Sequence, residues 1–179
     1  SNLLPRKVPI IVQPDINKKI LLLIKILILL MKNPFVIYSF INKERASDRK
    51  WKQIFINIII NSHILDQKLD WLHFGFATMG INRENVAHAI GAKSAVSLRG
   101  YDIILYPHKH PNCYSLLWDN IDKVHTISNH LFKKAVDIGL DSNISMTKIT
   151  PAIDINQFKP LMFEKIHSPV RIITVGRLK

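Results

Sequence analysis

The stretch VHTISNHLFKKAVDIG, residues 124–139, contains a complete strand-to-helix unit. Its start is mostly apolar or β-branched and predicts a strand at 124–127. Ser128 follows, and a serine at that place caps a helix because its hydroxyl accepts an N–H from the first turn. Gly139 closes the unit, since glycine readily adopts the positive φ that commonly follows a helix. The stretch therefore predicts a strand joined to a helix at 129–138.

Short β-like runs alternate with helical runs on both sides of this unit. We predict further strands at 69–74, 95–98, 145–149 and 170–175, and helices at 83–90 and 111–119. Alternation of this kind is typical of a parallel sheet. The predicted fold class is therefore α/β, a Rossmann-like parallel sheet with helices on both faces.

The first third of the chain has a different pattern. Residues 1–17 contain three prolines and predict an irregular lead-in. A helix is expected at 18–32, ended by Asn33-Pro34. A second is expected at 46–65, after a charged connector or first helical turn at 42–50. The helix at 18–32 is apolar nearly all round, which indicates either burial or contact with lipid.

The composition limits the class of protein. With 179 residues, 47% of them hydrophobic, the chain can form one domain with a buried core, or one domain and a fragment. Its 25 Lys and Arg against 13 Asp and Glu give a net charge of +12, which favours anionic partners. Cys113 is the only cysteine, so no disulfide can form within the chain and a cytoplasmic location is expected. The apolar run 20–31 is shorter than the roughly 20 residues that a membrane-spanning helix needs.

The positive charge is concentrated at residues 1–52, which hold eleven Lys or Arg and three acids. A basic, apolar segment fits peripheral contact with the anionic inner face of a membrane, and burial in the core explains its apolar residues equally well. Nucleic-acid binding would favour aromatic residues between the cations, and the run 18–33 has none. We therefore expect no nucleic-acid partner. The cations expected near lipid headgroups are Lys18, Lys19, Lys25, Lys32 and Arg45.

In parallel sheets, ligands bind beyond the carboxyl ends of the strands, so the residues that follow each predicted strand are candidates. Arg99 and Gly100 follow one strand and are succeeded by Asp102. Arginine offers a two-pronged donor to phosphate, glycine lets the backbone approach a ligand, and aspartate accepts from sugar hydroxyls. A plain β-turn with a surface salt bridge is the alternative for this segment.

Four further candidates come from the same argument. His73 ends a strand and could orient a hydroxyl or act as a base, or could simply be a half-buried histidine bonded to a backbone carbonyl. Ser128 is first a helix cap, although a helix N-terminus also favours an anion. Gly176 and Arg177 follow the last predicted strand, where a backbone turn and a guanidinium suit a phosphate.

Metal binding is not expected. His108 and His110 alternate around a lysine, but no third ligand lies close to them in the sequence. The sequence also has no Walker loop, HExxH, CxxC, GxSxG or complete GxGxxG pattern.

Five segments occur in an order that resembles a known family. They are LDWLHFGFATMG (69–80), AVSLRGYDI (95–103), KVHTISNHL (123–131), ITPAIDINQF (149–158) and VRIITVGRLK (170–179). Together they resemble the bacterial group-1 (family 4) retaining glycosyltransferases of polysaccharide synthesis, over residues 69–179. The sequence departs from the family pattern at Gly75 and Arg99, where the family has histidines, and at Ala152, where it has glycine.

The resemblance implies two Rossmann-like domains facing across a cleft, the GT-B arrangement. Residues 1–165 would form the acceptor-side domain without its first strand unit, and 166–179 the linker and first strand of a donor-binding domain. A sugar would move with retention from a nucleotide diphosphate to a glycan or lipid-linked acceptor, without a cofactor or metal. The implied catalytic residues are Arg99, Asp102 and His73, and the implied donor-binding residues are Gly100, Ser128, Asp154, Gly176 and Arg177. The chain alone would be inactive, because the site is built from two domains.

The alternative function is a non-catalytic α/β binding module, or an inactive fragment, that associates with an anionic membrane or partner. Both functions predict the same fold. They differ in whether the segments after the strands meet a nucleotide sugar.

Overall fold

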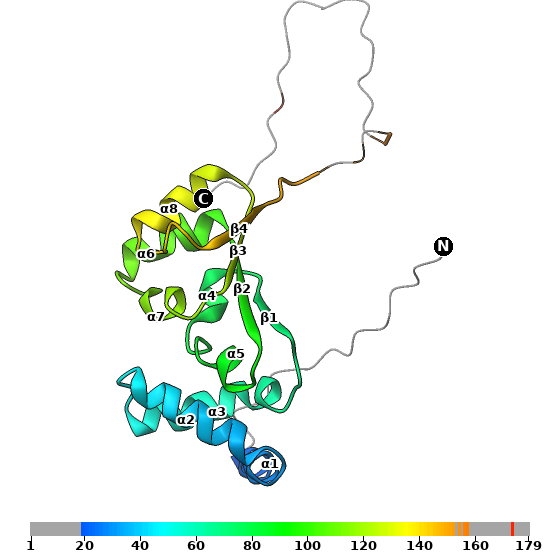
Figure 1. Cartoon of the computed structure of the whole chain (residues 1–179), viewed down its shortest axis with the longest axis vertical. Helices are drawn as coiled ribbons and strands as arrows, with labels where there is room; N and C mark the ends of the chain where they lie inside the picture. Colours follow the sequence, from blue (N-terminus) through cyan, green and yellow to red (C-terminus); the bar gives the residue numbers. More distant parts are fainter. Residues whose placement is uncertain (1–18, 153, 155, 158–172, 174–179) are drawn as a thin grey trace, which may run out of the picture.

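A computed structural model describes residues 19–152, 154, 156, 157 and 173 of the chain (Figure 1). Three helices come first: α1 (Lys19–Lys32), α2 (Pro34–Ala46) and α3 (Trp51–Leu65). The strands are β1 (Trp71–Phe74), β2 (Lys93–Leu98), β3 (Lys123–Thr126) and β4 (Ser145–Lys148). Between the strands lie α4 (Ala77–Gly80), α5 (Val86–Ala89), the π-helix η1 (Tyr101–Leu105), α6 (Tyr106–Lys109), α7 (Ser115–Trp118) and α8 (Asn129–Asp137).

The four strands form one parallel sheet in the order β1-β2-β3-β4. The predicted fold class, an α/β, Rossmann-like fold built on a parallel sheet, is thereby confirmed. The register places His73 opposite Ala95 and Ser97 opposite His125, so these four residues lie on the same face of the sheet.

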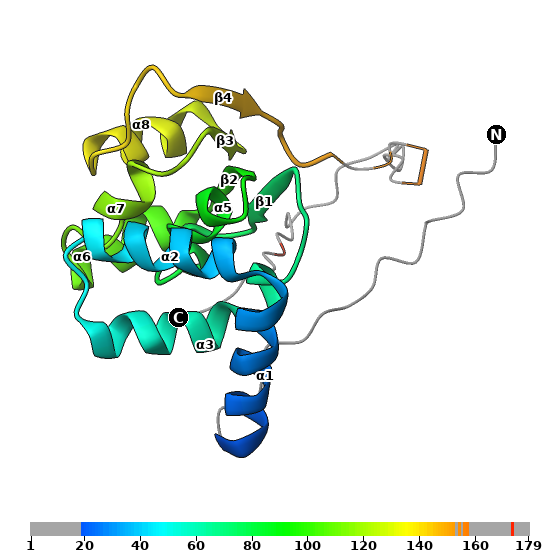
Figure 2. The ribbon, with the colours of Figure 1, turned by 60° about the horizontal axis from the view of Figure 1, so that its bottom comes forward.

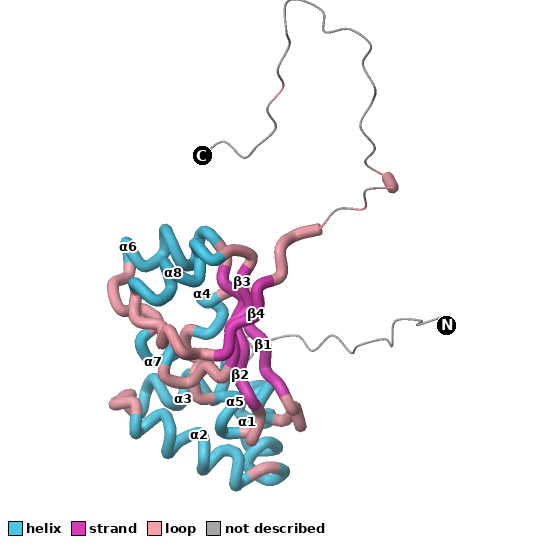
Figure 3. The backbone as a smooth tube through the Cα atoms, turned by 45° about the horizontal axis from the view of Figure 1, so that its top comes forward, coloured by secondary structure: helices cyan, strands magenta, loops and turns pink. Residues whose placement is uncertain are grey.

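The helices that pack most extensively on the strands, α4, α5 and α8, all lie on the other face (Figure 3). That face supplies Phe74, Val96, Leu98 and Val124 to the main hydrophobic core. Strand-to-strand crossovers are right-handed, so a sheet whose strands follow one another in a single direction places every crossover on the same side. No helix of the described part packs on the face that carries His73 and His125, so the prediction of helices on both faces is not met in the described part.

Helices α1 to α3 form a second hydrophobic core with α5, in which Phe40, Ile54 and Val86 are fully buried or nearly so. Figure 2 shows α2 and α3 side by side, with α1 extending away from them. Helix α1 ends as predicted, and Pro34 then begins a new helix that the sequence reasoning missed. Residues 42–46 therefore belong to α2, because a proline at the first helical position is well tolerated and need not only end a helix.

The other differences concern short helices. The predicted helix 83–90 is reduced to α5, and 111–119 is reduced to α7. The helical segment from Tyr101 to Lys109 was not predicted, because Pro107 and the polar residues after it indicate a loop. Gly139 has φ of +103° after α8, as its predicted role requires. Apart from Ile173, which is in no strand, the predicted strand 170–175 lies outside the described residues.

Candidate functional site

The turns after β1 and β2 are held together by one side chain, Asp102. Its Oδ2 accepts the backbone N–H of Ala77, in the turn after β1, at 2.7 Å. Its Oδ1 accepts the backbone N–H of Arg99, at the end of β2, at 3.0 Å. Tyr114 donates its hydroxyl to the Asp102 carbonyl at 2.8 Å. The carboxyl-end edge of the sheet, which we call the rim, is therefore a fixed structure at β1 and β2.

Asp102 is buried, with 1% of its surface exposed. Burial raises the pKa of its carboxyl, while the N–H donors of Ala77 and Arg99 and the Arg99 charge oppose that rise. Both oxygens already accept backbone hydrogen bonds. The geometry therefore supports a positioning role for Asp102, and its predicted place beside a reacting sugar stays a prediction.

Arg99 and Gly100 are exposed at this rim. Gly100 has an ordinary helical φ of −60°, and a Cβ there would meet nothing within 4 Å. Neither backbone conformation nor packing requires glycine at this position. The surface beside Arg99 is thus open for a ligand to approach.

His73 lies in a chain of hydrogen bonds across the strands. Its Nε2 is 2.9 Å from Ser97 Oγ, which is 2.9 Å from His125 Nδ1. Partial burial of the His73 imidazole lowers its pKa, and the positive charges of His125 and Arg99 lower it further. His73 is therefore favoured as a neutral imidazole within reach of the Arg99 charge. Its partner is a serine hydroxyl and not the backbone carbonyl that the alternative for His73 supposed.

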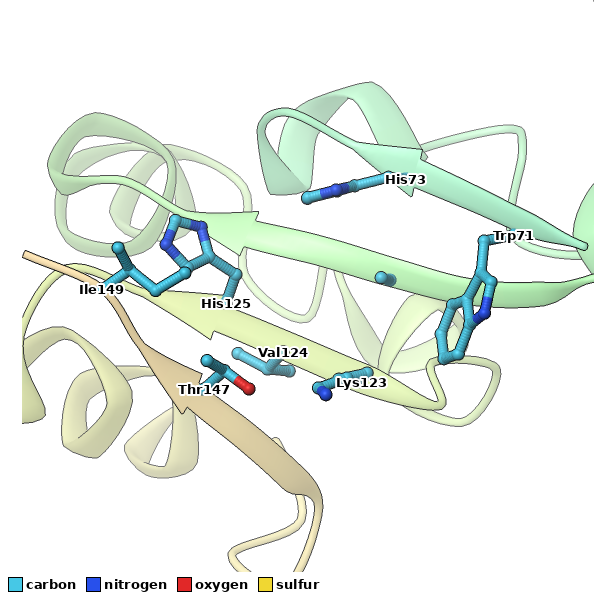
Figure 4. A pocket seen from close by; sticks show the side chains of 8 residues that line it. Trp71, His73, Lys123, Val124, His125, Thr147 and Ile149 are labelled. Carbon is cyan, nitrogen blue, oxygen red and sulfur yellow. The ribbon is translucent and has the colours of Figure 1, made fainter. Parts of the chain in front are cut away.

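A hollow of about 560 Å³ lies on the same face of the sheet (Figure 4). Residues from all four strands, or from the residue just after β4, line it: Trp71, His73, Ala95, Lys123, Val124, His125, Thr147 and Ile149. Figure 4 shows Trp71 and Lys123 toward the end where the strands begin, and His125 and Ile149 toward the rim. His73 therefore belongs both to the rim and to the hollow.

The donor-side residues are placed less closely together. Ser128 caps α8, since its hydroxyl accepts the N–H of Leu131 at 3.2 Å. Asp154 is exposed beyond β4 and accepts the N–H of Asn156 at 2.8 Å, with no described bond to the rim. Gly176 and Arg177 lie outside the described residues. The structure thus brings Arg99, Gly100, Asp102 and His73 together. Donor binding by the other four candidates, Ser128, Asp154, Gly176 and Arg177, stays a prediction.

Within the described part of the chain, no three His, Cys, Asp or Glu side chains form a group that could hold a metal ion. His108 and His110 are both exposed, at the end of α6 and just after it.

Sequence reasoning missed Ser97, His125 and the hollow. The signal was present, because His73, Ser97 and His125 each lie in a different predicted strand. Once the register of these strands is known, the three side chains fall on one face of the sheet. The register cannot be read from a single strand, so the three residues could not be joined in advance.

Comparison of the chain with known protein families, with curated proteins and with solved structures gives no significant match. The resemblance to glycosyltransferases therefore depends on the five sequence segments alone.

Proposed function

We propose that this chain is the acceptor-side part of a glycosyltransferase that moves a sugar from a nucleotide diphosphate to a glycan or lipid-linked acceptor, with retention. The observation that carries the proposal is the fixed rim, where Asp102 joins the turns after β1 and β2 beside the exposed Arg99. Ligands of parallel α/β sheets bind at this edge. In this proposal no metal neutralises the leaving diphosphate, so cations and backbone amides must do so.

The proposed roles follow from the chemistry of each group. Arg99 is always charged and offers paired donors, which suits a phosphate or the oxygens of a sugar. The neutral imidazole of His73 can accept or donate a hydrogen bond to an acceptor hydroxyl. Gly100 leaves room for that sugar. Asp102 fixes the positions of the two turns beside these groups, and Arg177 is proposed to bind the diphosphate from the donor side.

Arg99→Ala in the product of the full reading frame is expected to lower sugar transfer about 100-fold, since removing one preorganised donor typically has this effect. The assay measures transfer of label from a panel of nucleotide sugars to the lipid and glycan fraction of a membrane extract. Lys133→Ala is the control, because it removes an exposed cation on α8, away from the rim. Transfer by Arg99→Ala equal to that of Lys133→Ala would exclude Arg99 from the reaction. Absence of transfer from every donor would favour the binding-module function.

We also propose that helices α1 to α3 place this protein on an anionic membrane. None of the described helices is both long and apolar enough to cross a bilayer. Yet large apolar side chains are exposed on these helices, including Met31 at 79% and Phe35 at 85%. Phe35 and Tyr38 are spaced i, i+3 on one side of α2, and Trp51 and Phe55 are spaced i, i+4 on one side of α3.

Cations accompany these apolar residues. The Lys32 side chain is 60% exposed, and the Arg45 guanidinium lies 4.6 Å from the centre of the Trp51 ring. Lys50 and Lys52 are exposed around the start of α3. Lys18 and the side chains of Lys19 and Lys25 lie outside the described residues. Apolar side chains bordered by cations fit the interface of an anionic bilayer.

The chain is expected to sediment with vesicles that contain anionic lipid, and less so with purely zwitterionic vesicles or at high salt. Phe35→Ser combined with Tyr38→Ser should reduce sedimentation at least tenfold, because each buried aromatic ring contributes roughly 1.5–3 kcal/mol. Met146→Ser, on β4, removes an exposed apolar side chain elsewhere and should change nothing. Equal sedimentation of all three proteins would contradict membrane contact through α2.

A further inference from the structure

The open face of the sheet has an unusual composition for a parallel sheet. Parallel strands are normally covered on both faces and are apolar on both. The strand residues on this face are Trp71, His73, Lys93, Ala95, Ser97, Lys123, His125, Ser145 and Thr147. Only Trp71 and Ala95 are apolar. A face of this composition is better suited to a bound polar ligand than to the apolar stripe of a packed helix.

The hollow on this face has a positive electrostatic environment. Lys123 lines it, and the Lys93 Nζ lies 5.7 Å from the centre of the Trp71 ring. No aspartate or glutamate is among the described residues that line it. Neither lysine forms an ion pair with a described acid. An anion entering the hollow would therefore meet an uncompensated ammonium group at Lys123.

Apolar side chains also line the hollow near that cation. Trp71 provides an aromatic ring at one end, and Ile149 provides aliphatic surface after β4 (Figure 4). Its volume of about 560 Å³ lies within the roughly 300–1,000 Å³ of typical small-molecule sites. The bonds between His73, Ser97 and His125 fix the floor between β1 and β3.

We propose that this hollow is a binding site for an organic phosphate, with its phosphate group on Lys123 and its apolar or aromatic body against Trp71 and Ile149. Phosphates of this chemistry occur in two sources, amphiphiles such as prenyl phosphates and nucleoside diphosphates. The site goes beyond the proposed function, because binding can be measured without any transfer of sugar.

The test is calorimetric titration of the full chain with dodecyl phosphate below its critical micelle concentration, and separately with uridine diphosphate. At least one probe should bind, and Lys123→Gln should weaken that binding tenfold or more, as expected for loss of a charge-assisted hydrogen bond. Lys148→Gln is the matched control, because the Lys148 side chain alternates to the other face of β4. Ala95→Phe should abolish binding by filling the hollow.

The outcomes separate the sources. Dodecyl phosphate binding that depends on Lys123 assigns the site to an amphiphile, and uridine diphosphate binding that depends on Lys123 assigns it to a nucleotide. Dodecyl phosphate that binds all four proteins equally has bound the apolar surface of α1 to α3, and this result overturns the proposal. So does failure of both probes to bind the unmodified chain. Circular dichroism shows whether the Ala95→Phe variant is folded, and only then does its loss of binding reflect filling of the hollow. If Ala95→Phe does not fold, the Lys123→Gln variant decides the proposal.

Discussion

Arg49→Ala is expected to lower the free energy of unfolding by about 3–5 kcal/mol, because removing one partner of a buried ion pair leaves an uncompensated charge. For a domain of this size the loss corresponds to a fall in Tm of roughly 6–20 °C. Arg49 reaches Glu84 Oε2 at 2.7 Å and Glu44 Oε2 at 3.5 Å, and it donates to Asn82 Oδ1 at 2.8 Å. The Glu44 side chain is fully buried and that of Glu84 nearly so.

This cluster joins the helices before the sheet to the segment between α4 and α5. Glu44 also accepts from Asn57 on α3 at 2.6 Å and from Asn85 at 2.8 Å. Without Arg49, the two buried carboxylates would lose the cation that bonds to both of them, and only the Arg83 charge would still act on Glu84. The matched control is Lys134→Ala, whose pair with Asp137 is exposed and contributes less than about 1 kcal/mol.

The same variant should respond to pH in a defined direction. Burial raises the pKa of Glu84, and Arg49 opposes that rise. When the pKa of a carboxyl is higher in the folded than in the unfolded protein, the folded protein becomes less stable as pH rises through the folded pKa, because the carboxyl must then ionise where its charge is unfavourable. The loss of unfolding free energy caused by Arg49→Ala should therefore be larger at pH 7.5 than at pH 5. Urea unfolding of the variant and the unmodified chain at both pH values measures this loss. A deficit below 1 kcal/mol at pH 7.5 would show that the cluster contributes little.

The sequence predicted the elements whose local signals agree with the tertiary structure. The unit from β3 to Gly139 was predicted correctly because the β-branched run, the Ser128 cap and the glycine all specify the same boundaries. The strands were found because their apolar residues alternate or cluster between turn residues. Strand boundaries differed by one or two residues, as is usual for strand ends. The helix expected at 46–65 begins only at Trp51, because Ala46 belongs to α2, and the helices expected at 83–90 and 111–119 are shorter than predicted.

The parts that could not be predicted depend on contacts between distant residues. Nothing local to Asp102 indicates that its carboxylate accepts the N–H of Ala77, which is 25 residues away. The cluster of Glu44, Arg49 and Glu84 likewise requires two segments to meet. Helix α2 was missed because Asn33-Pro34 signals an end, and a second start at the same proline has no separate signal.

Asp102→Asn is expected to lower sugar transfer roughly 100-fold, because a displacement of about 1 Å in a reacting group can have that effect. The N–H groups of Ala77 and Arg99 point to different oxygens of Asp102, and in an asparagine one of those positions becomes an NH₂ donor that cannot accept. One buried N–H is left unpaired, which lowers the free energy of unfolding by about 1–3 kcal/mol. Asp119→Asn, an exposed change at the end of α7, should leave both quantities unchanged.

Hydrogen exchange separates this positioning role from general destabilisation. In Asp102→Asn the amide of Ala77 or of Arg99 should exchange faster, while amides in the middle of β3 keep their protection. Arg99→Ala should reduce transfer without changing exchange at Ala77, because the Arg99 side chain is not part of that bond. Transfer lost in both variants with faster exchange only in Asp102→Asn would mean that Arg99 meets the substrate and Asp102 holds the turn that carries it. Unchanged exchange and transfer in Asp102→Asn would show that the rim does not depend on this carboxylate.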